Sequence, residues 1–181
     1  MARTFTRYPT ISLAAEHFAM AHLLRRNILT YKAPPNNEGY DLICIHPDPR
    51  RSSTQVRVQV KSRMASDSDR GFPVKSASLN AFDYLIVVFL NVGYFYSRRK
   101  THGCEAGQAA PQFYTLPASF IRRHHDSTST WEKVRTRGLN MEPYEGTRGI
   151  EQIARTLKIE YPRKAEARDR VKVCVASPSA T

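Results

Sequence analysis

Residues 39–63 read GYDLICIHPDPRRSSTQVRVQVKSR, two short strands joined by a polar turn that contains two prolines. Side chains alternate between the two faces of a strand, so Gln59 and Lys61 share one face, roughly 7 Å apart. Asp41 stands at the start of the first strand. An acid that faces an amide and a lysine across adjacent strands is an unusual arrangement for stability alone. It suits a site that holds a divalent metal against a phosphate.

The length of the chain, 181 residues, is enough to bury a core without disulfides or metals. We expect a single domain over residues 1–161 and an exposed basic tail over residues 162–181. The longest apolar run, residues 84–90, is too short to span a bilayer. The first ten residues lack the apolar core of a signal peptide, so we expect a cytoplasmic protein.

The cysteines are three in number and far apart, at Cys44, Cys104 and Cys174. An odd, scattered set argues against a disulfide framework and against a zinc site, which needs closely spaced ligands. We therefore expect buried or inert thiols.

The net charge is the strongest indication of function in the composition, because the sequence has 28 lysines and arginines against 16 acids, a net charge of +12. Such an excess indicates a polyanionic partner, with nucleic acid first and an acidic membrane surface second. The alternative is a protein that is merely basic.

A helix is predicted over residues 12–26. Ser12 is a suitable N-cap, and Asn27 tolerates the left-handed conformation that ends helices. Glu16 is the only acid of this helix and, taken alone, is most simply a solvent-facing charge. One packing face is predicted at helical spacing, formed by Ala14, Phe18, Ala21 and Arg25 and flanked by Ala15 and His22. An adjacent apolar face is formed by Leu13, Met20, Leu23 and Leu24, so the helix is expected to be substantially buried.

Three strands are predicted next, over residues 28–33, 40–45 and 55–62. Short turns separate them, which favours an antiparallel meander. In the third strand, the side chains that point away from Gln59 and Lys61 are apolar: Val56, Val58 and Val60.

The nearly continuous apolar run over residues 82–90 predicts a central strand buried on both faces. A hairpin arm is predicted over residues 93–97 and another strand over residues 112–116. Pro117 is placed to open a helix, and residues 149–159 have helical spacing.

This order of elements resembles the PD-(D/E)XK nuclease superfamily over roughly residues 12–116. Tyr40 and Asp41 stand where that family has its PD, with Tyr in place of Pro, and residues 59–61, QVK, stand where it has (D/E)-X-K. Glu16 is similar to the acid that the family often carries on its first helix. The resemblance implies an α/β (α+β) fold of restriction-endonuclease-like type, a mixed sheet flanked by helices.

The resemblance also implies hydrolysis of DNA phosphodiester bonds with Mg²⁺ or Mn²⁺ as cofactor. Asp41 is then the central metal ligand, and Glu16, Gln59 and the backbone carbonyl of Val60 are further ligands. Lys61 is expected to orient the attacking water and to offset the charge that grows on the phosphorane.

Small members of the superfamily with this layout include Holliday junction resolvases, restriction enzymes and intron-encoded endonucleases. The sequence does not choose among them. A homodimer is what the family implies for cutting two strands.

Gln59 is the departure from the family pattern, because a neutral amide oxygen binds Mg²⁺ more weakly than a carboxylate. Glu38 and Asp48 lie close enough in the sequence to compensate, although both are most simply turn residues. Gln59 therefore supports an alternative, a nucleic-acid-binding module that keeps the fold and has lost cleavage. A third interpretation is a basic structural protein with an unrelated α/β fold.

Basic residues outside the motif are candidates for nucleic-acid binding. They are Arg98, Arg99, Lys100, Arg122 and Arg123. The alternative for each is a solvated basic surface. The neighbouring residues 124–126, HHD, have no partner spacing for a zinc site, and the two histidines are interpreted as exposed.

Overall fold

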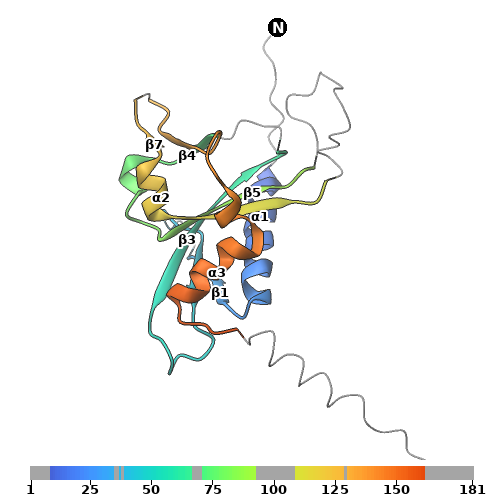
Figure 1. Ribbon diagram of the computed structural model, residues 1–181, viewed down its shortest axis with the longest axis vertical. Helices are drawn as coiled ribbons and strands as arrows, with labels where there is room; N and C mark the ends of the chain where they lie inside the picture. The colour runs from blue at the N-terminus through green and yellow to red at the C-terminus, as the bar shows by residue number, and fades with distance from the viewer. Residues whose placement is uncertain are drawn as a thin grey trace, which may run out of the picture.

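The computed structural model describes residues 9–34, 37, 39–66, 71–92, 109–128 and 130–161. Within them, five strands form one mixed sheet with helices on both faces (Figure 1). In the order in which they pair, these strands are β1 (Leu29–Lys32), β2 (Leu42–Ile45), β3 (Gln55–Arg63), β5 (Tyr84–Phe89) and β6 (Gln112–Pro117).

The sheet combines both kinds of strand pairing. β1, β2 and β3 form the predicted antiparallel meander, whereas β3 pairs with β5 in parallel and β5 with β6 antiparallel. β5 is buried on both faces, as its continuous apolar run predicted. The predicted fold class, a mixed sheet flanked by helices, is confirmed.

A second, small sheet and a short helix cover one face of the main sheet (Figure 1). The small sheet consists of β4 (Gly71–Pro73), β8 (Lys133–Arg135) and β7 (His125–Asp126), with the 3₁₀ turn η1 (Ser76–Ser78) after β4. The helix, α2 (Ala118–Arg123), follows Pro117 as predicted. Their apolar side chains enclose one core with the side chains of β5 and β6: Phe72, Val74, Phe82, Leu85, Val87, Phe89, Leu116, Ala118, Ile121 and Val134.

Helices α1 (Pro9–Arg25) and α3 (Gly146–Thr156) cover the opposite face, with the 3₁₀ turn η2 (Glu142–Tyr144) before α3. The predicted helix over residues 149–159 is thus confirmed, with both an earlier start and an earlier end. Truncating a buried leucine such as Leu23 to alanine in this second core costs about 2–5 kcal/mol. Helix residues of this core include Ala15, Ala19, Leu23, Ile150, Ile153, Ala154 and Leu157.

The predicted packing face of α1 is wrong at three of its four positions, whereas Phe18 packs against the core. Ala14, Ala21 and Arg25 are exposed, and the helix packs instead through the stripe of Ala15, Ala19 and Leu23. The helix also begins at Pro9, so Ser12 lies inside it and is not its N-cap. The residues of α1 are small or apolar on nearly every side of the helix. The small side chains of Ala15 and Ala19 let the helix approach the valines of β3.

Two helices end in the same backbone motif, with a non-glycine residue in the left-handed conformation. At the end of α1, Asn27 has φ 57°, and the amide of Ile28 donates to the carbonyl of Leu23 at 3.1 Å. At the end of α3, Lys158 has φ 59°, and the amide of Ile159 donates to the carbonyl of Ala154 at 2.9 Å. These bonds satisfy carbonyls that a helix end leaves unpaired, and the predicted role of Asn27 is confirmed.

Gly39 fixes the entry to β2. Its φ is +100°, and a Cβ at this position would overlap the Cβ of Ala81 on the segment before β5. Glycine alone tolerates both the backbone conformation and the close approach, so Asp41, two residues later, starts from a tightly defined position.

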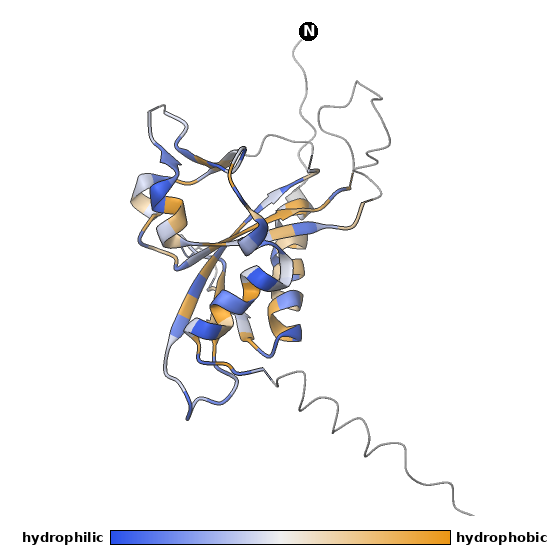
Figure 2. Ribbon diagram, viewed as in Figure 1, coloured by the Kyte–Doolittle hydropathy of each residue, from blue (hydrophilic) through white to orange (hydrophobic). Residues whose placement is uncertain are grey.

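Apolar colour is concentrated on the central strands, and polar colour covers the turn between β2 and β3 (Figure 2). Cys44 is fully buried on β2, and burial raises the pKa of its thiol to about 12, as expected of an inert cysteine. The other two cysteines lie outside the described residues. Among the described helices, none is long and apolar enough to cross a membrane.

Candidate active site

Asp41 lies directly before β2, in a backbone position fixed from both sides. Its amide donates to the carbonyl of Val58 at 2.9 Å, and its carbonyl accepts from the amide of Ala33 at 2.8 Å. The ladder pairs Leu42 with Val58, which places Asp41 across from Gln59. The acid and the amide of the sequence motif are therefore cross-strand neighbours.

The carboxylate of Asp41 binds the backbone of β3. The amide of Val60 donates to Asp41 Oδ2 at 2.6 Å, just beyond the point where β2 stops pairing with β3. A charge-assisted bond of this length is strong and orients the carboxylate. The sequence did not predict this bond, because the bond depends on where β2, the shorter of the two strands, begins. The side chain of Val60 is in the core, and its carbonyl as a metal ligand stays a prediction.

Burial raises the pKa of Asp41 above its usual range, against the opposing effect of the Val60 amide. Glu16 raises this pKa further through charge repulsion, whereas Lys61 and Lys32 lower it. The charged groups of α1, β1 and β3 thus act on one carboxylate, which places Glu16 and Lys61 in the surroundings of Asp41.

Glu16 reaches this region from α1 and is not the free surface charge that the helix alone suggests. Its Oε2 lies 2.8 Å from Nζ of Lys32 on β1, and its side chain is 21% exposed. Lys32 was missed by the sequence analysis. The predicted meander could have indicated Lys32, because antiparallel pairing brings the end of the first strand, where Lys32 lies, beside the start of the second strand, where Asp41 lies.

Gln59 and Lys61 point to the face of the sheet that the small sheet and α2 cover, since they align with Leu85 and Val87 of β5. The amide oxygen of Gln59, Oε1, is buried and has no hydrogen-bond partner within the described part of the chain. An unpaired buried oxygen costs about 1–3 kcal/mol. Such an atom is suited to bind a ligand that the protein itself does not supply.

Lys61 is held partly out of water. Burial lowers the pKa of its ammonium group, the Asp41 carboxylate acts to raise it, and Arg63 acts to lower it. A desolvated lysine beside a carboxylate is suited to donate hydrogen bonds to a water or to a phosphate oxygen.

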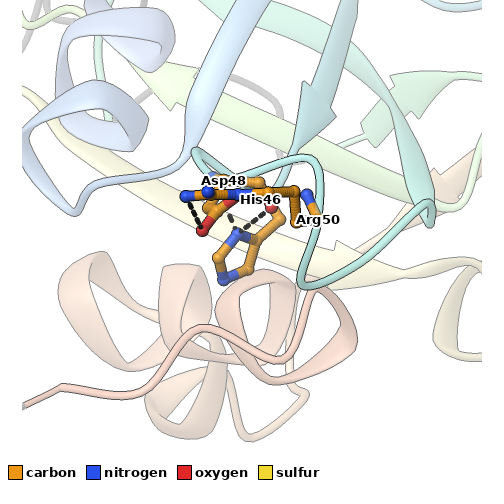
Figure 3. Close-up of polar contacts among 3 residues, drawn as sticks. All are labelled: His46, Asp48 and Arg50. Carbon is orange, nitrogen blue, oxygen red and sulfur yellow. Dashed lines mark hydrogen bonds and ion pairs between the residues drawn. The ribbon is translucent and has the colours of Figure 1, made fainter.

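Asp48 takes no part in this site, because it lies at the other end of β2 and organises the turn that follows. Figure 3 shows its carboxylate bound to Arg50, with Oδ1 2.9 Å from Nε and Oδ2 3.1 Å from Nη2. Its amide donates to Nδ1 of His46 at 2.9 Å. Asp48 is therefore a turn residue, and Glu38 lies outside the described residues.

The residues proposed to bind nucleic acid are only partly described. Arg122 and Arg123 are exposed at the end of α2, on the face of the sheet to which Gln59 and Lys61 point. Arg122 donates to Asn80 Oδ1 at 3.1 Å. Residues 98–100 lie outside the described residues.

The expectation of exposed histidines at 124 and 125 is wrong, because both are half-buried, and the difference is greatest for His125. Its side chain is 7% exposed, and Nε2 lies 2.8 Å from the carbonyl oxygen of Val74 and joins β7 to the segment after β4. In the described part of the chain, no group of three His, Cys, Asp or Glu side chains gathers to hold a metal. A metal bound near Asp41 and Glu16 therefore needs the Gln59 oxygen, backbone or water as further ligands.

No family model matches the chain, and no curated protein matches it. Among solved structures, it is similar to a bacterial homing endonuclease, with 16% identity and a TM-score of 0.46 over 93% of this chain and 99% of that one. It is also similar to the Holliday junction resolvase Hjc of Archaeoglobus fulgidus, with 8% identity and a TM-score of 0.44 over 83% of this chain and 98% of that one. At these scores neither likeness bears on chemistry.

Proposed function

We propose that this protein is a metal-dependent endonuclease that hydrolyses DNA phosphodiester bonds. The observation that carries the proposal is the Oε1 atom of Gln59 across from Asp41, which is buried and has no hydrogen-bond partner among the described residues, with the charges of Glu16 and Lys61 acting on the Asp41 carboxylate. Glu16 lies on the helix that covers one face of the sheet and Lys61 points to the other face, and the charges of both act on the carboxylate of Asp41.

The oxygen donors fit Mg²⁺ or Mn²⁺. Hard divalent cations prefer carboxylate and carbonyl oxygens, which Asp41, Glu16 and Gln59 offer. The Val60 amide fixes the Asp41 carboxylate before any ligand arrives. When bound, the metal supplies charge to a phosphate oxygen and makes a water more acidic.

Lys61 has the role of orienting that water and stabilising the charge that grows on the phosphate. Its partial burial strengthens each of these interactions, because water competes less for its hydrogen bonds.

The basic surface supplies affinity for the DNA backbone. The net charge of +12 favours a polyanion, and Arg122 and Arg123 stand on the same side of the sheet as Lys61. Residues 98–100 remain proposed contacts on sequence grounds.

The test is cleavage of supercoiled, linear and branched DNA in Mg²⁺ or Mn²⁺. Asp41→Asn and Lys61→Met are expected to lower the rate at least about 100-fold, as loss of one transition-state contact typically does. Asp48→Asn and Lys75→Met are matched controls that change the same charges away from the site, and both should cut as wild type. Equal cleavage by wild type, Asp41→Asn and Lys61→Met would overturn the proposal.

A second candidate is a nucleic-acid-binding module without cleavage, which the neutral Gln59 favours. Gln59→Glu separates the two, because it adds the missing negative charge at an otherwise similar side chain. If wild type binds DNA without cutting it in either metal and Gln59→Glu restores cutting, the module is the correct assignment. Cleavage by wild type that is lost in Asp41→Asn excludes it.

A further inference from the structure

The ion pair between Lys32 and Glu16 occupies one of the two acids of the proposed metal site. Lys32 is the last residue of β1, and its Nζ lies 2.8 Å from Glu16 Oε2. Its side chain is 43% exposed and that of Glu16 is 21% exposed, so water reaches the lysine more than the acid.

The sheet holds Lys32 at this place. The ladder pairs Lys32 with Leu42, and the amide of the next residue, Ala33, donates to the carbonyl of Asp41 at 2.8 Å. The positive charge of Lys32 also acts on Asp41, where it lowers the pKa of the carboxyl against the larger effect of burial. Lys32 is therefore a neighbour of both acids.

The charges of these four groups balance without a metal. Glu16 and Asp41 contribute two negative charges, and Lys32 and Lys61 contribute two positive charges. A divalent cation that takes an oxygen of Glu16 arrives within a few ångströms of the Lys32 ammonium, where like charges repel strongly. Lys32 has a flexible stem on an edge strand and can turn into solvent.

We propose that Lys32 is a tethered counter-cation that competes with the divalent metal for Glu16 and so sets the metal concentration at which the site fills. This inference rests on the proposed function. Lys32 is a positioning residue here, since it acts on the metal through Glu16.

The competing explanation is that the pair only fastens α1 to β1. An ion pair that water reaches contributes little to stability, and α1 is already held by the packing of Ala15, Ala19 and Leu23. A fastening role predicts a change in thermal stability and none in metal affinity. Competition predicts a change in metal affinity and none in thermal stability.

The experiment is calorimetric titration of Mn²⁺ into the full chain at fixed ionic strength, without DNA. Lys32→Met should bind Mn²⁺ about fivefold more tightly than wild type, because the metal no longer has to break the ion pair with Glu16. Lys32→Arg keeps the charge and should bind as wild type. Lys75→Met removes an exposed lysine elsewhere and should also bind as wild type.

A double-mutant cycle identifies the partner. In a Glu16→Gln background, Lys32→Met should raise Mn²⁺ affinity by clearly less than fivefold, because the acid for which lysine and metal compete is gone and only the weaker effect of the Lys32 charge at Asp41 remains. A fivefold effect that persists in this background would overturn the inference, since it would come from general electrostatics.

Failure of the inference and failure of the proposed function give different results. Equal affinities of wild type and Lys32→Met, both abolished by Asp41→Asn, would overturn the role of Lys32 alone. Absence of Mn²⁺ binding in both proteins would overturn the metal site and this inference with it. Thermal unfolding of each variant verifies that it is folded at the titration temperature.

Discussion

The charge of Asp41 lies in a half-buried position, so it lowers the stability of the folded protein at neutral pH. Burial raises the pKa of Asp41 in the folded protein above that of the unfolded chain, so ionisation of this carboxyl opposes folding at neutral pH. Asp41→Asn should therefore raise the melting temperature of the metal-free protein at pH 7. The difference should shrink as the pH falls through the folded pKa toward that of a free aspartate, about 4.

Thermal unfolding in a chelator between pH 4 and pH 8 measures this difference. Addition of Mn²⁺ should raise the melting temperature of wild type and leave that of Asp41→Asn unchanged. A variant that is less stable than wild type at pH 7 would contradict the prediction.

The sequence predicts the members of the site that follow from strand alternation and misses those that depend on packing. Gln59 and Lys61 share a face because side chains alternate along β3. The bond from the Val60 amide to Asp41 depends on β2 being shorter than β3. The pairing of Lys32 with Glu16 depends on how α1 lies across β1, which no local pattern encodes.

At the scale of elements, the end of α3 stores a small strain at Lys158. A residue with a Cβ at φ 59° costs roughly 1 kcal/mol relative to glycine. Lys158→Gly should therefore stabilise the protein by about 1 kcal/mol, measured by urea unfolding. Lys158→Ala removes the same charge and keeps the Cβ, so it should have the stability of wild type. An equal gain in stability over wild type in both variants would mean that the charge matters and the backbone conformation does not.

The entry to β2 is predicted to be intolerant of any side chain at Gly39. Gly39→Ala should destabilise the fold by about 2–4 kcal/mol, because it combines an unfavourable φ with an overlap at Ala81. It should also weaken Mn²⁺ binding, since Asp41 is displaced.

The double variant Gly39→Ala with Ala81→Gly is the matched control for this prediction. It removes the overlap and keeps the backbone strain, so it should recover part of the lost stability in urea unfolding. Recovery of none would mean that the overlap does not contribute.

α1 shows why the prediction of an element can be right and that of its face wrong. The helix has small or apolar residues on nearly every side, with Leu13 and Leu24 exposed at 46% and 45%. Helical periodicity selects a face only where polar residues mark the opposite one. The contacts of Ala15 and Ala19 decide the face here, because only small residues allow close approach to β3.

At the scale of the whole molecule, the main sheet was predictable and the small sheet was not. Each strand of the main sheet is a run of at least four residues with apolar alternation or continuity. The strands β4, β7 and β8 have two or three residues each and come from distant parts of the chain. Such short strands exist through tertiary packing around Phe72 and Val134, which a local pattern does not carry.

The net charge of +12 predicts DNA binding that depends steeply on salt. If about six phosphates are neutralised, affinity should fall about 1,000-fold between roughly 50 and 200 mM salt. Asp41→Asn should bind with the same salt slope as wild type, because it changes the chemistry of the site and adds no contact with phosphates. Fluorescence anisotropy with a labelled duplex measures both slopes, and affinity independent of salt would contradict the prediction.

The parallel pairing of β3 with β5 has a consequence for how the protein is made. The chain emerging from the ribosome completes α1 and the antiparallel unit β1–β2–β3 first, yet the second edge of β3 stays open until β5 has been synthesised. An open edge with buried-type valines pairs readily with other chains. A chain that terminates before Tyr84 contains every proposed catalytic residue, yet we expect it to aggregate through this open edge. The smallest active fragment must therefore include β5 as well as the residues that perform the chemistry.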